Sequence, residues 1–188
     1  MMNSKKYIHI NTLKKNFSHY KINKMVKTEE LRKVNKRYYI NLLFDGDEND
    51  YYCVDVFISN GVVCQLSAAV YYELTTYRPF TIDVAVIRNQ KVYDLPDYPP
   101  MNPIYYSKLR YELGIVDIET KEGKYKIYDM EKTICDLLFY RNKLDKEIIK
   151  EVMNNYVKRS DKDINKLIVY AKQLRVYEIL KTYFEVLL

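Results

Sequence analysis

Hydrophobic residues recur at helical spacing through the last third of the chain, residues 128–188, a stretch with neither glycine nor proline. Apolar side chains at positions i, i+3 and i+4 indicate amphipathic helices, and the Asp or Ser before each of the first three runs is a typical N-cap. Because isolated helices shorter than about 12–15 residues are marginal, they must pack together or on a common sheet. The pattern predicts four short helices, beginning at Asp129, at Asp145, near Ser160 or Asp161, and near Val176.

The middle of the chain changes between strand and helix patterns. Residues 52–59 fit either a strand or the start of a helix, residues 62–75 a helix, and residues 81–88 a strand. Residues 94–103 contain four of the five prolines and are predicted to be an exposed loop. Further expected elements are a strand at 104–106, a helical turn at 108–113 that ends at Gly114, and a hairpin of strands 115–120 and 124–128. Strands and helices grouped in this way predict an α+β fold, a small mixed sheet with helices against it.

The first forty residues show another order: two short helices followed by two short strands. The first helix, residues 10–17, has Asn11 or Thr12 as its cap, and Ser18 caps the second, residues 19–27. Strands at 31–34 and 37–40 are joined by a turn at Asn35 and Lys36. Helix, turn, helix and hairpin is the order of a winged helix-turn-helix. We therefore expect a winged-helix-like module at residues 1–44 and a second domain at residues 45–188, separated by the acidic segment 44–51.

The positive charge is concentrated in the first module. Eleven Lys and Arg residues stand against two Glu through residue 43, a net charge of +9, whereas the remainder carries 20 basic and 23 acidic residues, a net charge of −3. A basic module on a near-neutral body is typical of nucleic-acid-binding proteins. The alternative is a small helix–hairpin subdomain with a solvated lysine-rich face. The bundle also carries a basic set, for which solvated faces are the favoured interpretation: Arg141, Lys143, Lys158, Arg159, Lys162, Lys172 and Arg175.

Winged-helix geometry selects the candidate DNA contacts. The second helix of such a module enters the major groove through its N-terminal residues, and lysines mostly contact phosphates. The candidates on the helix are His19, Tyr20, Lys21, Asn23, Lys24 and Lys27, and those on the wing are Lys33, Lys36 and Arg37.

Several segments resemble one known protein family. They are EKTICDLL at residues 131–138, the Tyr-Ala-Lys of residues 170–172, the closing YFEVLL, the helix QLSAAVYYELT at residues 65–75, the strand IDVAV at residues 82–86 and YELGI at residues 111–115. This pattern resembles the AbiEi antitoxins of type IV toxin–antitoxin and abortive-infection systems, over nearly the whole chain. The resemblance implies an antitoxin that binds its own promoter DNA through an N-terminal winged helix-turn-helix. It also implies a nucleotidyltransferase-type toxin as functional partner, without requiring a stable complex.

The N-terminal module departs from this family in two places. Only MMNSKKY precedes the helix predicted at residues 10–17, so either residues 5–9 are a remnant of the family's first helix or that helix is missing. The wing has Lys36 and Arg37 where a glycine is usual. Phosphate contacts could survive such losses while sequence readout is lost. An antitoxin or interaction protein without DNA binding is therefore the second hypothesis.

Catalytic and metal-binding patterns are weak. The sequence has no Gly-Ser turn of a nucleotidyltransferase, no phosphate-binding loop and no nucleophile elbow. Three carboxylates, Asp83, Glu112 and Asp136, form the minor hypothesis of a metal-dependent nuclease. The DGDEND segment lacks the spacing of a calcium loop. We therefore predict a non-enzymatic protein without metal or cofactor.

The remaining features concern the compartment. Cys53, Cys64 and Cys135 have no paired spacing and fit reduced thiols. No apolar run reaches the roughly 18 residues of a membrane helix, and the first residues lack the apolar core of a secretory signal. These features predict a cytoplasmic protein that does not bind membranes.

Overall fold

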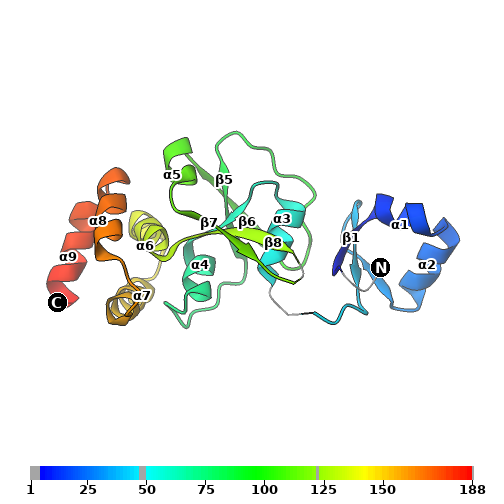
Figure 1. Ribbon diagram of the computed structural model, residues 1–188, viewed down its shortest axis with the longest axis horizontal. Helices are drawn as coiled ribbons and strands as arrows, with labels where there is room; N and C mark the ends of the chain where they lie inside the picture. The colour runs from blue at the N-terminus through cyan, green and yellow to red at the C-terminus, as the bar shows by residue number, and fades with distance from the viewer. Residues whose placement is uncertain (1–4, 47–49, 122, 188) are drawn as a thin grey trace.

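The computed structural model describes residues 5–46, 50–121 and 123–187, and it is elongated (Figure 1). A small N-terminal head lies at one end, a sheet-containing body in the middle and a helical bundle at the other end. The mixture of helices with two separate sheets confirms the predicted α+β class.

The head contains three strands and two helices. They are β1 (Tyr7–His9), α1 (Ile10–Asn16), α2 (His19–Lys27), β2 (Leu31–Lys33) and β3 (Tyr38–Asn41), with an antiparallel sheet in the order β1-β3-β2. The predicted helix pair and hairpin are present. Strand β1 was not predicted, and the N-cap of α1 is His9 rather than Asn11 or Thr12. The His9 Nδ1 atom accepts a hydrogen bond from the Asn11 backbone N–H at 3.1 Å. Strand β1 ends at His9, so the helix begins directly after it.

The two faces of the head sheet have different partners, as strand alternation requires. Ile8, Leu31 and Tyr39 face α1 and α2, where they pack with Leu13, Ile22 and Met25 in the head's own core. Tyr7, Tyr38 and Ile40 face the body. The rings of Tyr7 and Tyr38 each lie 5.1 Å from the ring of Phe57, centre to centre. Head and body therefore share one hydrophobic cluster in addition to the connecting segment.

The body is a five-stranded sheet in the order β6-β5-β4-β8-β7. Its strands are β4 (Val62–Val63), β5 (Ile82–Ile87), β6 (Met101–Tyr106), β7 (Ile115–Glu119) and β8 (Lys124–Tyr128). The pairs β4–β8 and β5–β6 are parallel, while β4–β5 and β7–β8 are antiparallel. A 3₁₀ turn η2 (Asp50–Tyr52) and three helices complete the body: α3 (Cys53–Phe57), α4 (Gln65–Tyr71) and α5 (Lys108–Glu112).

Three local predictions in the body need correction or completion. Within residues 52–59, left open between strand and helix, Tyr52 ends η2 and residues 53–57 form α3. Val62 and Val63 belong to a central strand rather than to the predicted helix, which begins only at Gln65. Strand β6 begins at Met101, within the predicted loop, and contains Pro103. A proline is tolerated there because β6 is an edge strand of the sheet.

The bundle has the four predicted helices: α6 (Met130–Phe139), α7 (Lys146–Lys158), α8 (Ile164–Gln173) and α9 (Tyr177–Leu187), with the 3₁₀ turn η3 (Arg141–Lys143) after α6. Asp129 and Asp145 cap α6 and α7 as predicted. The start of α8 is corrected. Its cap is Asp163, whose side chain accepts a hydrogen bond from the Lys166 backbone N–H, whereas Asp161 is held by Arg159.

Helix α6 brings charged residues into the core. Lys132 and Asp136 are fully buried and paired with each other, and Arg110 of α5 reaches the same carboxylate at 2.7 Å. The Lys132 ammonium also lies 3.9 Å from the centre of the Tyr128 ring. Burial lowers the pKa of Lys132, although the Asp136 carboxylate opposes that effect. The segment EKTICDLL thus forms the packed junction between sheet and bundle.

Candidate nucleic-acid interface

Helix α2 is held in the head by its buried face and by its N-terminal cap. Ile22 and Met25 are 2% and 4% exposed and anchor the helix to the head core. The Ser18 hydroxyl accepts a hydrogen bond from the Lys21 backbone N–H at 3.3 Å, as predicted for its cap. The opposite face and the N-terminal turn are left to solvent.

That solvent face carries all six candidates predicted on the helix, and each of them is exposed. Tyr20, Asn23, Lys24 and Lys27 have the spacing i, i+3, i+4 and i+7, which places them in one row opposite the buried residues. His19 and Lys21 flank this row, and Tyr20 is 80% exposed. We call the row of Tyr20, Asn23, Lys24 and Lys27 the α2 ridge. Helix α2 contains three lysines and no acidic residue, so the ridge can bind a polyanion without internal competition.

The wing candidates are also exposed, but their surroundings differ. Lys33 lies at the end of β2, and Lys36 lies in the turn to β3. Asn35 closes that turn because its Oδ1 atom accepts hydrogen bonds from the backbone N–H groups of Arg37 and Tyr38. The hairpin turn is thus an Asx turn and is formed without a glycine. The Arg37 guanidinium pairs with Asp94 of the body, Nε to Oδ2, at 3.1 Å.

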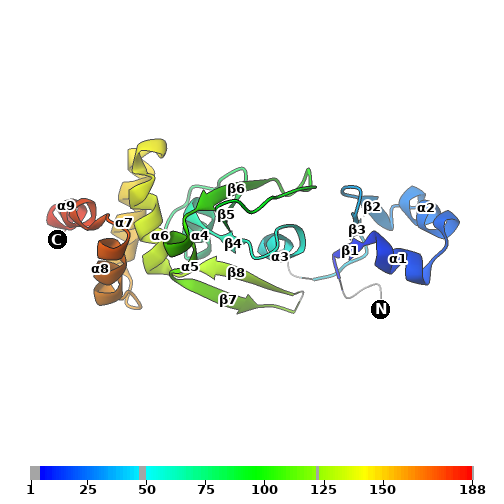
Figure 2. The same ribbon diagram turned by 90° about the horizontal axis from the view of Figure 1, so that it is seen from above.

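The exposed face of α1 adds charge that the predicted contact set did not include. Lys14 and Lys15 are exposed near the end of this helix. Their contribution could have been anticipated from the amphipathic pattern, in which Leu13 alone is buried. In Figure 2, α2 and β2 lie on one side of the head and α1 on the other.

The carboxylates of the nuclease hypothesis have separate partners. Asp136 binds Arg110 and Lys132, and Asp83 accepts a hydrogen bond from the Asn102 amide at 2.9 Å. Glu112 is exposed and lies 3.9 Å from Lys108. Burial raises the pKa of Asp83, and the Asn102 hydrogen bond partly offsets this. Within the described ranges, no three His, Cys, Asp or Glu residues are grouped to hold a metal ion. The DGDEND segment includes residues 47–49, which lie outside these ranges.

Two arginines and several lysines of the bundle's basic set are engaged within the protein. Arg159 makes two hydrogen bonds of 2.7 Å to Asp161 and one of 2.9 Å to the Tyr72 carbonyl. Arg141 donates to the Leu138 carbonyl, and Lys162 donates to the Arg159 carbonyl. Lys172 lies over the ring of Tyr177 at 5.2 Å. These contacts favour a structural role for Arg141, Arg159, Lys162 and Lys172.

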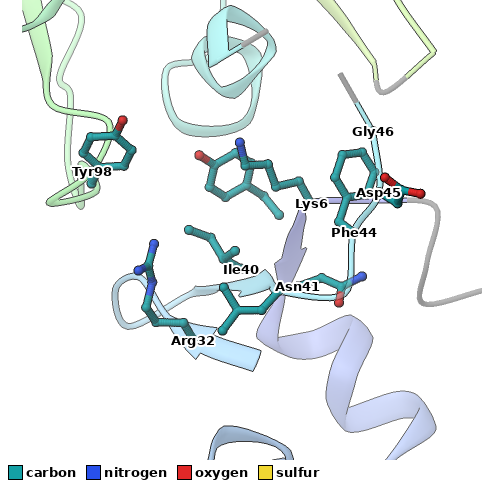
Figure 3. Close-up of a pocket in the computed structure, with 10 residues that line it drawn as sticks. Lys6, Arg32, Ile40, Asn41, Phe44, Asp45, Gly46 and Tyr98 are labelled. Carbon is teal, nitrogen blue, oxygen red and sulfur yellow. The ribbon is translucent and has the colours of Figure 1, made fainter. Parts of the chain in front are cut away.

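A pocket of about 410 Å³ opens between the head and the body (Figure 3). Its floor is the row Tyr7, Ile40 and Arg32, which are neighbours across the three strands of the head sheet. Tyr98 of the body lies across the gap from Arg32. Lys6 and Arg32 bring positive charge to the pocket and Asp45 brings negative charge. The pocket lining therefore carries charges of both signs.

No known family model matches the chain, and no curated protein matches it. Of the helices in the described part of the chain, none combines the length and the apolar character needed to cross a bilayer.

Proposed function

We propose that this protein is a DNA-binding regulator that inserts α2 of its head into the major groove of duplex DNA. The observation that carries the proposal is the α2 ridge. Its four side chains are exposed in one row of a helix that is capped at its N-terminus and anchored from behind. Lysines of such a row suit phosphates, and Asn23 suits the edge of an adenine.

The architecture of the head supports a winged helix-turn-helix assignment. Two helices lie between β1 and β2, and the β2–β3 hairpin returns so that β3 pairs with β1. The hairpin turn with Lys36 and Arg37 then takes the place of the wing. The net charge of +9 over the first 43 residues supports a polyanionic partner rather than a neutral protein surface.

We further propose that the regulator is an antitoxin of a type IV toxin–antitoxin system that represses its own operon. Support comes from the resemblance of residues 131–138 and the other segments to AbiEi antitoxins. Those residues are buried in α6, so the resemblance concerns the residues that build the core. The partners are then its own promoter DNA and a nucleotidyltransferase-type toxin, which the antitoxin counteracts with or without a direct complex.

DNA binding is tested by fluorescence anisotropy with a duplex from the region upstream of its own gene, at several salt concentrations. The logarithm of affinity is expected to fall with the logarithm of salt, with a slope of about −0.9 for each phosphate neutralised. Replacing Lys21, Lys24 and Lys27 by Ala should weaken binding about 100-fold and flatten the slope by about 2.7. The matched control replaces three exposed bundle lysines, Lys146, Lys158 and Lys172, and should leave both quantities nearly unchanged. Equal effects of the two triple variants would refute the assignment.

The antitoxin role is tested by growth rescue. If a nucleotidyltransferase gene lies next to the gene of this chain, its product is expressed alone or with this chain. We expect co-expression to restore growth and the α2 triple variant to lose repression of a promoter reporter. Growth that stays arrested with folded, abundant protein would contradict the antitoxin role.

A second function, an interaction protein acting through the body alone, is favoured by one loop. Residues 75–81 present Phe80, which is 89% exposed, beside the exposed Tyr77. The Glu151 carboxylate holds this loop through hydrogen bonds from Thr75 and Thr76 of 2.6–2.9 Å. Growth rescue without any salt-dependent DNA binding would support this function over the first.

A further inference from the structure

The turn of the proposed wing is docked on one residue of the body. The Asn35 amide donates a hydrogen bond of 2.6 Å to the Asp94 backbone carbonyl, and the Asp94 carboxylate lies 3.1 Å from the Arg37 guanidinium. Asp94 belongs to the loop between β5 and β6, which reaches toward the β2–β3 hairpin in Figure 2. A residue almost sixty positions away in the sequence thus meets the wing.

The packing of the head against the body holds Arg37 and Asp94 close together. The body-facing side of the head sheet rests on α3, where Phe57 touches the rings of both Tyr7 and Tyr38. Tyr38, the first residue of β3, directly follows Arg37, so the aromatic cluster fixes the end of the turn that carries Arg37. The ion pair is therefore part of a defined head–body contact.

The Arg37–Asp94 ion pair is weak enough for another anion to replace the Asp94 carboxylate. The side chains of Arg37 and Asp94 are 61% and 36% exposed. Ion pairs with such exposure contribute about 0–1 kcal/mol because water screens them. A DNA phosphate offers the Arg37 guanidinium an alternative pair of anionic oxygen acceptors, and counterion release adds to its affinity.

We propose that Asp94 is a positioning residue of the DNA interface that occupies the phosphate place on Arg37 in the free protein. DNA binding exchanges the Asp94 carboxylate for a backbone phosphate, so the body lowers the affinity of the head for DNA. This inference rests on the proposed DNA-binding function. It identifies an acidic residue outside the basic head as a determinant of affinity.

Asp94→Asn isolates the carboxylate. The Asn35 hydrogen bond goes to the backbone carbonyl of residue 94 and is retained in this variant. Asp94 has a φ of 55°, a left-handed conformation that Asn adopts as readily as Asp. The matched control is Asp97→Asn, the same charge change in the same loop. Asp97 is exposed and has no ion-pair partner among the described residues.

The experiment measures duplex affinity against salt for the full-length protein and its Asp94→Asn, Asp97→Asn, Arg37→Gln and Asp94→Asn/Arg37→Gln variants. Asp94→Asn should bind about three- to fivefold more tightly than Asp97→Asn, with a slope steeper by about 0.9. In the Arg37→Gln background, Asp94→Asn should have little further effect.

Equal affinity and slope for Asp94→Asn and Asp97→Asn would overturn the inference while leaving the proposed function standing. Weaker binding by Asp94→Asn would also overturn it, because Asp94 would then act only as a structural latch. A wild-type protein without salt-dependent duplex binding would overturn the proposed function, and this inference with it.

Discussion

Helices α2 and α6 carry their lysines in opposite ways. Lys132 of α6 is fully buried between the Asp136 carboxylate and the Tyr128 ring. Lys21, Lys24 and Lys27 of α2 are exposed and have no ion-pair partner among the described residues. A buried charge must be paired because desolvation is costly, whereas an exposed charge contributes little to folding. The charges of α6 therefore belong to the fold, and those of α2 are available to an external anion.

The largest expected effect comes from removing the buried counter-charge. Asp136→Ala leaves Lys132 and Arg110 in the core without their shared carboxylate. We expect the free energy of unfolding to fall by about 3–5 kcal/mol, the usual loss when one partner of a buried pair is removed. Urea denaturation monitored by circular dichroism measures this. The matched control, Glu147→Ala, removes the exposed partner of Lys150 and should cost less than about 1 kcal/mol. Similar losses in both variants would erase the contrast between buried and exposed charges.

The next largest effect distinguishes residues of α2 that recognise the base sequence from those that contact phosphates. Asn23→Ala should reduce discrimination between the operator and a scrambled duplex by about 1–3 kcal/mol, because it removes a side chain that can bond to a base edge. Lys27→Ala should weaken binding to both duplexes about equally. Competition anisotropy with the two duplexes measures both. Loss of discrimination in Lys27→Ala but not in Asn23→Ala would assign the roles the other way round.

Removing the N-cap of α2 or of α7 tests whether a well-ordered first turn of α2 is needed for DNA binding. Ser18→Ala and Asp145→Ala each remove a capping hydrogen bond, in the head and in the bundle respectively. Each should cost about 1 kcal/mol of stability. Only Ser18→Ala should also weaken duplex binding, because it loosens the turn that carries Tyr20 and Lys21. Thermal melting and anisotropy check the pair, and equal DNA affinity of the two variants would contradict this prediction.

The smallest effect is a pH dependence in the body. Hydrogen bonds from Thr75 and then from Thr76 lower the pKa of Glu151 below its ordinary value of 4.5. A carboxyl group with a lowered folded pKa stabilises the fold above its unfolded pKa, and this contribution is lost as the pH falls through the folded pKa. Because the carboxylate is partly exposed, the contribution should stay below about 1 kcal/mol. The stability difference between wild type and Glu151→Gln should therefore shrink below pH 4.5. A constant difference would contradict the linkage.

Sequence patterns were most informative where several local signals agree. Ser18 gives the start of α2, and the spacing of Ile22 and Met25 gives its buried face, so the helix and its exposed row could both be predicted. The same holds for α6 and α7, whose Asp caps precede apolar residues at helical spacing. The DNA role of the exposed row stays a prediction.

Other features could not be predicted because short elements and long-range contacts leave no periodic signal. Strands β1 and β4 have three and two residues, too few for an alternation. For α8, Ser160, Asp161 and Asp163 are all cap-type residues, and the choice follows from Arg159 holding Asp161. The Arg37–Asp94 pair joins distant segments. It depends on how head and body pack.

The most direct test of the central contrast is a map of backbone amide chemical-shift changes when the upstream duplex is added to the full-length protein. We predict the largest changes at residues 18–27 and in the wing turn at residues 35–37, with the bundle helices α7–α9 essentially unchanged. Changes centred on the bundle, with α2 unaffected, would contradict the account.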